Sequence, residues 1–238
     1  MYGLIIRKLP KIRLVHLLTD PSNYREIASI ASLQPLSAHM EYTQVVNPRF
    51  TGVVPRENAA HPEHISDDPE FGLNRVNRKY IGPGTWGCFQ AHKSAIINSY
   101  DANLDYLLVC ECDCVINVKL SRFLTILAQL GASMSARDMW SVFIGGHGAP
   151  NGSKIDEFYF SEQSVDAHCV LYPMATLPNV IRLLETEKWA PFDLWLGFML
   201  KRRLAVTVGN FASQVAGKSL VDGTFKGKEL GRVVLGDK

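Results

Sequence analysis

The stretch Leu107-Leu-Val-Cys-Glu-Cys-Asp-Cys-Val-Ile-Asn-Val118 decides how this chain folds. It is apolar and rich in β-branched residues, which is typical of a buried strand. Two carboxylates, Glu111 and Asp113, interrupt it, although carboxylates are rarely buried without a partner. Because side chains alternate along a strand, both are expected on one face, where they would suit a hard divalent cation. The alternative is a strand that runs into a solvated acidic turn, since short acidic motifs recur by chance.

Three cysteines alternate with these carboxylates and are therefore expected on the opposite strand face: Cys110, Cys112 and Cys114. Neighbours two residues apart on one strand make poor disulfide partners. A zinc site is the other interpretation, but no Cys-x-x-Cys pair supports it. We therefore predict that these cysteines are reduced and act as small core residues.

Composition restricts the class of protein. The 238 residues are 47% hydrophobic and 20% charged, which is usual for a globular protein with a substantial core. The net charge of +2 gives little support for nucleic acid or an anionic membrane as a partner. The sequence has no apolar run of the roughly 18 residues that a membrane span needs, and the apolar core of its first seven residues is too short for a secretory signal. The expected location is the cytoplasm, or the host cytoplasm if the protein is viral.

The order of predicted elements favours an α/β fold. Residues 12–18 read as a strand, 19–23 as a turn rich in helix-capping residues, 24–33 as a helix and 41–46 as a second strand. This order is the usual opening of a parallel sheet flanked by helices. Further helices are predicted over 82–100, 118–130, 175–187 and 189–203. Further strands are predicted over 107–118, 140–144, 157–160, 166–172 and 205–208. Residues 48–80 are predicted to be irregular, and residues 145–152 to form a flexible loop. We find no repeat or linker, so a single domain with a mostly parallel central sheet is expected.

Three segments also match one known pattern, in the same order along the chain. They are Gly84-Thr-Trp-Gly-Cys-Phe-Gln-Ala-His-Lys93, Leu104-Asp-Tyr-Leu-Leu-Val-Cys-Glu-Cys-Asp113, and Ala190-Pro-Phe-Asp-Leu-Trp195 with Gln214 and Ser219 downstream. The pattern resembles the lipooligosaccharide and procollagen-type glycosyltransferases, family 25 of the sequence classification. Gly87, Cys88 and His92 match the family's Gly-Cys-x-x-Ser-His helix, with Ala91 in place of the serine. Glu111-Cys112-Asp113 stands where the family has an acidic triplet of the Asp-x-Asp type.

This resemblance covers roughly residues 12–220 and implies a GT-A fold, with a nucleotide-sugar half over about 12–118 and an acceptor half over about 119–220. Glu111 and Asp113 would bind Mn²⁺ or Mg²⁺, and the cation would bridge the diphosphate of a donor, with a UDP-sugar favoured. Donor contacts are expected from Leu18, Thr19, Asp20, Arg25, Thr85, His92, Lys93 and Lys218.

Asp193 is the candidate general base that faces the acceptor, because such a base must reach the hydroxyl that it deprotonates. Its structural alternative is a helix N-cap after Pro191. Trp195 and Gln214 are the expected acceptor contacts. The chain has no histidine after His168, although many GT-A enzymes use a late histidine as a third metal ligand.

Other functions remain open at this point. The chain is alternatively a degenerate carbohydrate- or nucleotide-binding protein, or a metal-dependent nucleotidyl or phosphoryl transferase, since paired carboxylates also serve that chemistry. For a glycosyltransferase, the acceptor expected from the family is a surface glycan or another hydroxyl. A phage or viral DNA base is the less favoured acceptor, because it would call for a basic groove.

Overall fold

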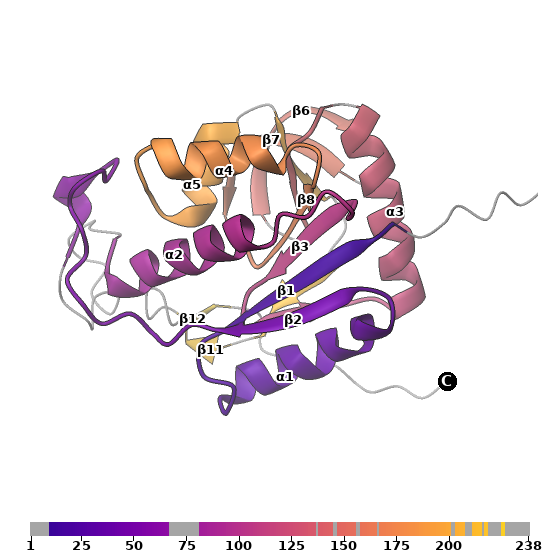
Figure 1. Ribbon diagram of the computed structural model, residues 1–238, viewed down its shortest axis with the longest axis horizontal. Coiled ribbons are helices and arrows are strands. Elements are labelled where there is room, and N and C mark those ends of the chain that lie inside the picture. The colour runs from indigo at the N-terminus through magenta and orange to yellow at the C-terminus, as the bar shows by residue number, and fades with distance from the viewer. Residues whose placement is uncertain are drawn as a thin grey trace, which may run out of the picture.

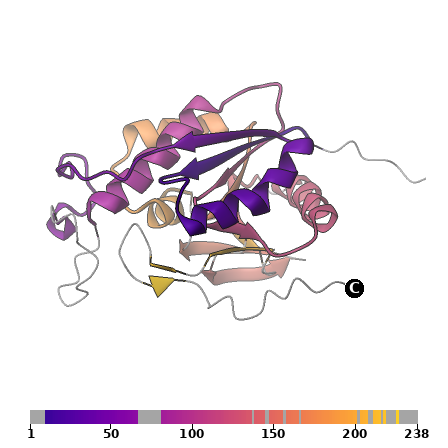
Figure 2. The same cartoon turned by 90° about the horizontal axis from the view of Figure 1, so that it is seen from below.

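The computed structural model describes residues 10–66, 81–136, 138–144, 147–155, 158–165, 167–200, 203–207, 211–215, 217–218 and 225–226. Its centre is an eight-stranded sheet with helices packed on it (Figures 1 and 2). In sheet order the strands are β2 (Glu41–Val46), β1 (Ile12–Leu18), β3 (Tyr106–Cys110), β8 (Cys169–Pro173), β5 (Ser141–Phe143), β9 (Leu204–Thr207), β7 (Phe158–Val165) and β6 (His147–Ile155). The pairings set β7 and β8 antiparallel to the other strands of this sheet.

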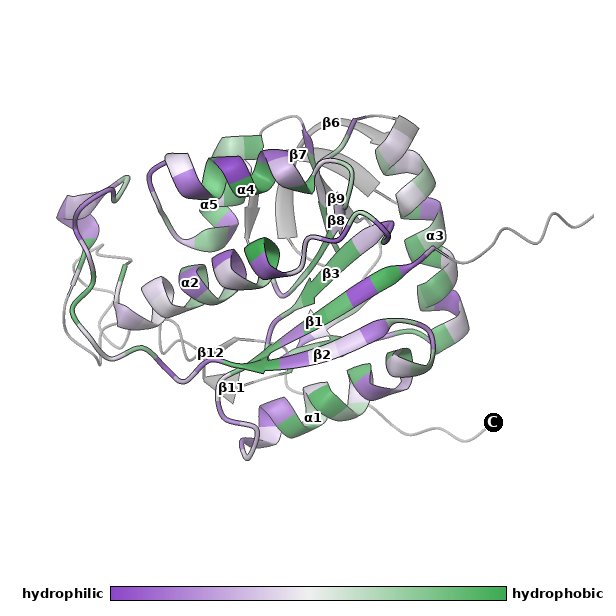
Figure 3. Ribbon diagram, viewed as in Figure 1, coloured by the Kyte–Doolittle hydropathy of each residue, from purple (hydrophilic) through white to green (hydrophobic). Residues whose placement is uncertain are grey.

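Helices cover the sheet on two faces because side chains alternate along its buried strands. The helices are α1 (Tyr24–Leu33), α2 (Pro83–Asn98), α3 (Leu120–Ala136), α4 (Leu177–Thr186) and α5 (Phe192–Leu200). Leu107 and Val109 of β3 belong to one hydrophobic core with residues of α2, α4 and α5. Leu108 and Cys110 belong to a second core with residues of α1 and α3. Figure 3 shows the hydrophobic run along β3 between these layers.

Smaller elements complete the described chain. They are the 3-10 turns η1 (Gln34–Ala38) and η2 (Pro62–His64), the pair β4 (Cys114–Ile116) with β10 (Ala212–Gln214), and the pair β11 (Gly217–Lys218) with β12 (Phe225–Lys226). The expected fold class is confirmed: a single α/β domain whose central sheet, with all strands but β7 and β8 running in one direction, is flanked by helices. The division into two functional halves stays a prediction.

Two expected elements differ most from the structure. The strand predicted over 107–118 stops at Cys110, and Glu111–Asp113 form a turn before β4. Leaving the sheet at residue 111 lets the carboxylates avoid the apolar layers on either side. The loop predicted over 145–152 is replaced from residue 147 by β6, which pairs with β7 in an irregular register. This tertiary pairing outweighs the weak strand preference of its glycine, proline and asparagine residues.

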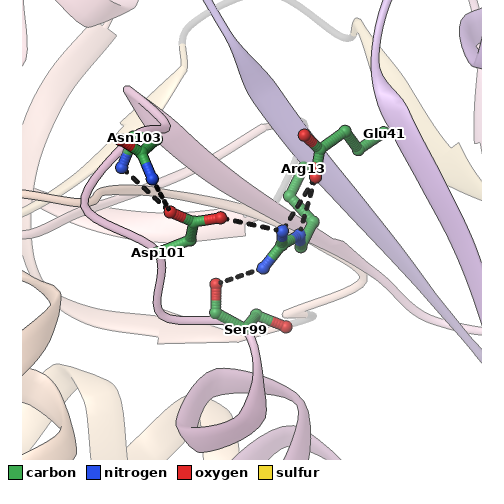
Figure 4. A network of polar contacts seen from close by, with 5 residues as sticks. All are labelled: Arg13, Glu41, Ser99, Asp101 and Asn103. Atoms are coloured by element: carbon green, nitrogen blue, oxygen red, sulfur yellow. Dashed lines mark hydrogen bonds and ion pairs between the residues drawn. The ribbon is translucent and has the colours of Figure 1, made fainter.

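A polar network ties together the amino ends of β1 and β2 and the loop before β3 (Figure 4). Arg13 pairs with Glu41 at 2.8 Å and with Asp101 at 3.2 Å, and donates to the carbonyl of Ser99 at 3.0 Å. Asp101 also accepts from the backbone and side-chain amides of Asn103. This end of the sheet is therefore closed by a network of partnered charges, and the candidate site lies at the other end.

Candidate functional site

A cavity of about 1070 Å³, counted out to its open mouth, lies beyond the carboxyl ends of β1, β2 and β3. The first turns of α2 and the start of α5 form two of its other walls. This is where open α/β sheets usually bind ligands. The sequence-predicted site residues that line it are Leu18, Thr19, Arg25, Thr85, His92, Glu111, Asp113, Asp193 and Gln214.

Asp113 is the buried carboxylate of the acidic turn. Arg25, from the first turn of α1, forms an ion pair with its Oδ2, and both side chains are at most 10% exposed. The backbone of Val215 joins the two, because its carbonyl accepts from Arg25 Nε at 3.1 Å and its N–H donates to the Asp113 carbonyl at 2.8 Å. Helix α1, the acidic turn and the segment after β10 are therefore held together at one point.

The other carboxylate oxygen of Asp113, Oδ1, does not take part in this ion pair. Among the described residues, Asp113 Oδ1 is buried and has no hydrogen-bond partner. Burial, and then the nearby charge of Glu111, raise the pKa of Asp113 to about 7, and Arg25 only partly opposes them. A hard divalent cation would supply the missing partner, because it binds carboxylate oxygens and a second carboxylate lies nearby. Glu111 and Asp113 therefore fit the cation that the sequence predicts.

Glu111 faces a different set of partners. Its Oε1 lies 3.0 Å from His92 Nε2 and 3.6 Å from Cys88 Sγ. The His92 ring is fully buried and stacks on Phe192 of α5, with the ring centroids 3.9 Å apart. Helix α2 thus fixes one oxygen of Glu111, whereas α1 fixes one oxygen of Asp113.

The turn between β1 and α1 is shaped by a buried glutamate. Glu26 accepts hydrogen bonds from the backbone N–H groups of Thr19 and Asp20 at 2.9–3.1 Å. These amides are already used, so they are not the anion-binding groups of the cavity. Asn23 caps α1 by accepting from the Arg25 N–H, which sets the position of the Arg25 side chain.

Asp193 lies on the α5 side of the cavity. It is the second residue of α5, after Phe192, and its Oδ1 accepts from the adjacent Leu194 N–H at 2.8 Å. The N-cap position belongs to Pro191, whose carbonyl accepts from Trp195 N, so the N-cap alternative does not describe Asp193. Its half-buried carboxylate lies at the amino end of α5.

Three other predicted site residues do not line the cavity: Asp20, Lys93 and Trp195. Asp20 is exposed and accepts from Ser22, and half-buried Lys93 does not line the cavity. Trp195 is 0% exposed, packed in the core, with its indole N–H donated to the carbonyl of Lys188. A ring without exposed area cannot stack on an acceptor sugar, so this expectation is corrected. Lys218 belongs to β11, but its side chain lies outside the described part of the chain, as does Ser219.

Sequence reasoning missed one wall of the cavity, formed by the segment after β2. Asn47, Arg49 and Phe50 line it. Asn47 N–H donates to the Leu18 carbonyl at 2.7 Å, which holds this segment beside β1. A Cβ at Gly87 would come within 3.0 Å of Phe50 Cβ, so a glycine in α2 lets the segment lie close. In the sequence, Gly87 was the residue that could have indicated this close approach, but Phe50, which packs against it, is distant in the sequence.

The three cysteines at 110, 112 and 114 do not share one strand face, as their alternation predicted. All five are free, and Cys110, Cys114 and Cys169 meet in the core, with Cys110 Sγ 3.7 Å from Cys169 Sγ. Cys112 instead lines the cavity with the carboxylates, because the turn at 111–113 ends the strand alternation. Metal-donor sets within the described residues include Cys88, His92 and Glu111 beside the cavity and the three core cysteines.

No helix in the described part of the chain combines the length and apolarity that crossing a bilayer requires. No protein-family model matches the sequence, and no curated protein matches it.

Several solved structures are similar to this one at low identity. The mannose-1-phosphate geranyltransferase from Thermus thermophilus aligns with a TM-score of 0.44 and 12% identity, over 85% of this chain and 76% of that one. A197 from STIV gives 0.43 and 10%, over 93% and 97%. A glycosyltransferase involved in glycosylation of the major capsid of PBCV-1 gives 0.39 and 13%, over 83% and 81%.

Proposed function

We propose that this chain is a GT-A-type glycosyltransferase, which moves a sugar from a nucleotide-diphosphate sugar, preferably a UDP-sugar, to a hydroxyl of a glycan or similar acceptor. One observation carries the proposal. A single cavity joins a buried carboxylate that has an unpartnered oxygen, Asp113, to a second carboxylate at the start of a helix, Asp193. Asp113 would bind the cation that accompanies the donor, and Asp193 would contact the acceptor.

The charge of the cavity argues for a cation. Glu111, Asp113 and Asp193 line it against the two arginines Arg25 and Arg49, and Arg25 is already paired. A diphosphate would be repelled from the acidic turn unless a cation neutralised it. Glu111 and Asp113 would hold Mn²⁺ or Mg²⁺, which when bound supplies the positive charge that stabilises a departing nucleoside diphosphate.

The rest of the donor would extend along β1 and the start of α2. Helix α2 has no side-chain N-cap, and Gly84 and Thr85 of its first turn line the cavity. The amino end of a helix favours phosphate oxygens. The nucleoside would lie against Leu18 and Asn47, which line the cavity side by side, with the exposed Arg49 beyond them.

Asp193 would orient the acceptor and take its proton. In the proposed step the acceptor oxygen bonds to the anomeric carbon, its proton passes to Asp193, and the bond from that carbon to the diphosphate oxygen breaks. The products are a glycosylated acceptor and a nucleoside diphosphate. A surface glycan is the proposed acceptor class.

Thermal unfolding with a panel of nucleotide sugars, with and without Mn²⁺, tests the donor half of this proposal. A donor at about 100 times its dissociation constant should stabilise the protein by about 2.7 kcal/mol, and only with the cation. Asp113→Asn should lose this stabilisation, whereas the matched variant Asp20→Asn, outside the cavity, should keep it. If no nucleotide sugar stabilises the wild type, or if Asp113→Asn responds like the wild type, the proposal is overturned.

A further inference from the structure

Three side chains with different metal-ligand atoms meet on the α2 side of the cavity. Cys88 and His92 are four residues apart on α2, so they lie on the same helix face. Glu111 reaches them from the turn after β3. Within this group the sulfur, the imidazole nitrogen and the carboxylate oxygen all lie within 4.8 Å of one another.

Their spacing is close to that of ligands around one zinc ion. With Zn–S near 2.3 Å and Zn–N and Zn–O near 2.1 Å, tetrahedral ligands lie about 3.6 Å apart for sulfur and oxygen and about 3.4 Å for nitrogen and oxygen. The Cys88 Sγ to Glu111 Oε1 distance is 3.6 Å, and His92 Nε2 lies 3.0 Å from the same oxygen. A shift of a few tenths of an ångström at His92 would bring this pair to the zinc value.

The site is held in place and open on one side. The His92 ring is fixed by stacking on Phe192, and Cys88, His92 and Glu111 all line the cavity. An ion therefore has an entry path and a position left for a solvent or substrate atom. The three core cysteines, at most 1% exposed, have the sulfur atoms for a metal but are enclosed by the hydrophobic core.

We propose that Cys88, His92 and Glu111 bind a zinc-class divalent ion, Zn²⁺ or Co²⁺. Sulfur and imidazole ligands select such ions over Mg²⁺ and Mn²⁺. The site therefore differs from the hard-cation site at Glu111 and Asp113, with Glu111 common to both. The inference does not depend on glycosyl transfer.

Titration of Co²⁺ into the metal-free full-length protein tests this site, because cobalt reports its ligands by absorption. The expected result is one equivalent of Co²⁺ with a sulfur-to-cobalt charge-transfer band and visible bands of a four-coordinate ion. Cys88→Ser should abolish the charge-transfer band. His92→Gln should weaken binding by about tenfold or more.

Two cysteine variants serve as matched controls. Cys112→Ser changes a thiol of the same cavity, and Cys114→Ser changes one of the core group, so both should keep the band. Absence of a charge-transfer band in the wild type, or its persistence in Cys88→Ser, overturns the proposal. Its loss in Cys114→Ser but not in Cys88→Ser places the metal in the core and also overturns it. Donor stabilisation with Mn²⁺, measured on the same wild-type preparation, reports separately on the proposed function.

Discussion

Two arginines meet carboxylates near opposite ends of the same strands, and their surroundings differ. At the amino end, the Arg13 side chain is 24% exposed and its partners Glu41 and Asp101 are 56% and 32% exposed. At the carboxyl end, the Arg25 and Asp113 side chains are 6% and 10% exposed. The Arg13 network spreads its charge over several partners, whereas Asp113 keeps one oxygen without a hydrogen-bond partner among the described residues.

This difference distinguishes a structural charge network from a site that lacks a bound ligand or ion. Solvent screens the Arg13 network, and each of its pairs contributes little to stability. A buried polar atom without a partner is costly, so it marks a position where a ligand or ion completes the structure. The carboxyl end is therefore where binding is expected to stabilise the protein.

The largest expected effect comes from removing the buried arginine. Arg25→Met keeps much of the side-chain volume but removes the ion pair, so the buried Asp113 carboxyl must either stay charged without a partner or take up a proton. Breaking a buried pair in this way costs about 3–5 kcal/mol. Urea denaturation near neutral pH measures it. A loss no larger than that of Arg13→Met would show that the two ends of the sheet do not differ.

The next effect concerns His16, which lies on β1 between the two arginine sites. Its ring is fully buried between Tyr42 and Ser29, and burial lowers its pKa to about 4. The unfolded chain binds a proton below the usual pKa near 6.5, whereas the folded protein does not until about pH 4. Stability is therefore complete above pH 6.5 and falls as the pH drops to 4, by about 3 kcal/mol.

Unfolding free energies of the wild type and His16→Gln, measured from pH 7 to pH 4, isolate this loss. Asp113 acts in the opposite direction, because its raised pKa makes the folded state bind the proton first. That contribution is common to both proteins and cancels in their difference. Equal pH dependence in the two proteins would contradict the role given to His16.

Asp193→Asn should reduce sugar transfer by about 100-fold, the usual scale for loss of a general base, which corresponds to about 2.7 kcal/mol at the transition state. Donor stabilisation with Mn²⁺ should be unchanged, because the acidic turn is intact. Steady-state rates and thermal shifts on one preparation measure both. An Asp193→Asn variant that keeps its turnover and only loses stability would restrict Asp193 to a helix-terminal role.

The smallest effect belongs to the amino end. Arg13→Met removes two partly exposed ion pairs and should cost about 1 kcal/mol, and less in high salt. Donor binding should not change, because Arg13 is remote from the cavity lining. Urea denaturation at two salt concentrations checks the first statement, and donor thermal shifts check the second.

The sequence predicted those features that depend on local pattern. The strands predicted over 12–18 and 41–46 have the bounds of β1 and β2, and the capping residues at 19–23 precede the start of α1 as expected. Glu111 and Asp113 were expected near the carboxyl end of a central strand and lie just beyond that end, in a turn, because the strand was predicted to run too far, to residue 118. A short apolar run does not reveal where hydrogen-bond pairing with β8 stops, and it stops at Cys110.

What the sequence could not predict depends on distant contacts. Arg25 was placed near a nucleotide, but its ion pair with Asp113 brings together residues 88 positions apart. The segment at Phe50 enters the cavity because it packs on Gly87. Trp195 was expected to contact the acceptor because it is an aromatic residue of the matched segment 190–195, whereas helix packing places it in the core.

Product analysis tests the central claim most directly. The wild type is incubated with a nucleotide sugar that stabilises it, Mn²⁺ and a glycan acceptor, and products are identified by mass spectrometry. A sugar transferred to the acceptor, with release of nucleoside diphosphate, is the predicted result, and Asp113→Asn should form neither product. Transfer of a nucleotide or phosphate instead would assign the cavity to a nucleotidyl or phosphoryl transferase. Donor binding without any release of nucleoside diphosphate would make the protein a binding module and contradict the claim.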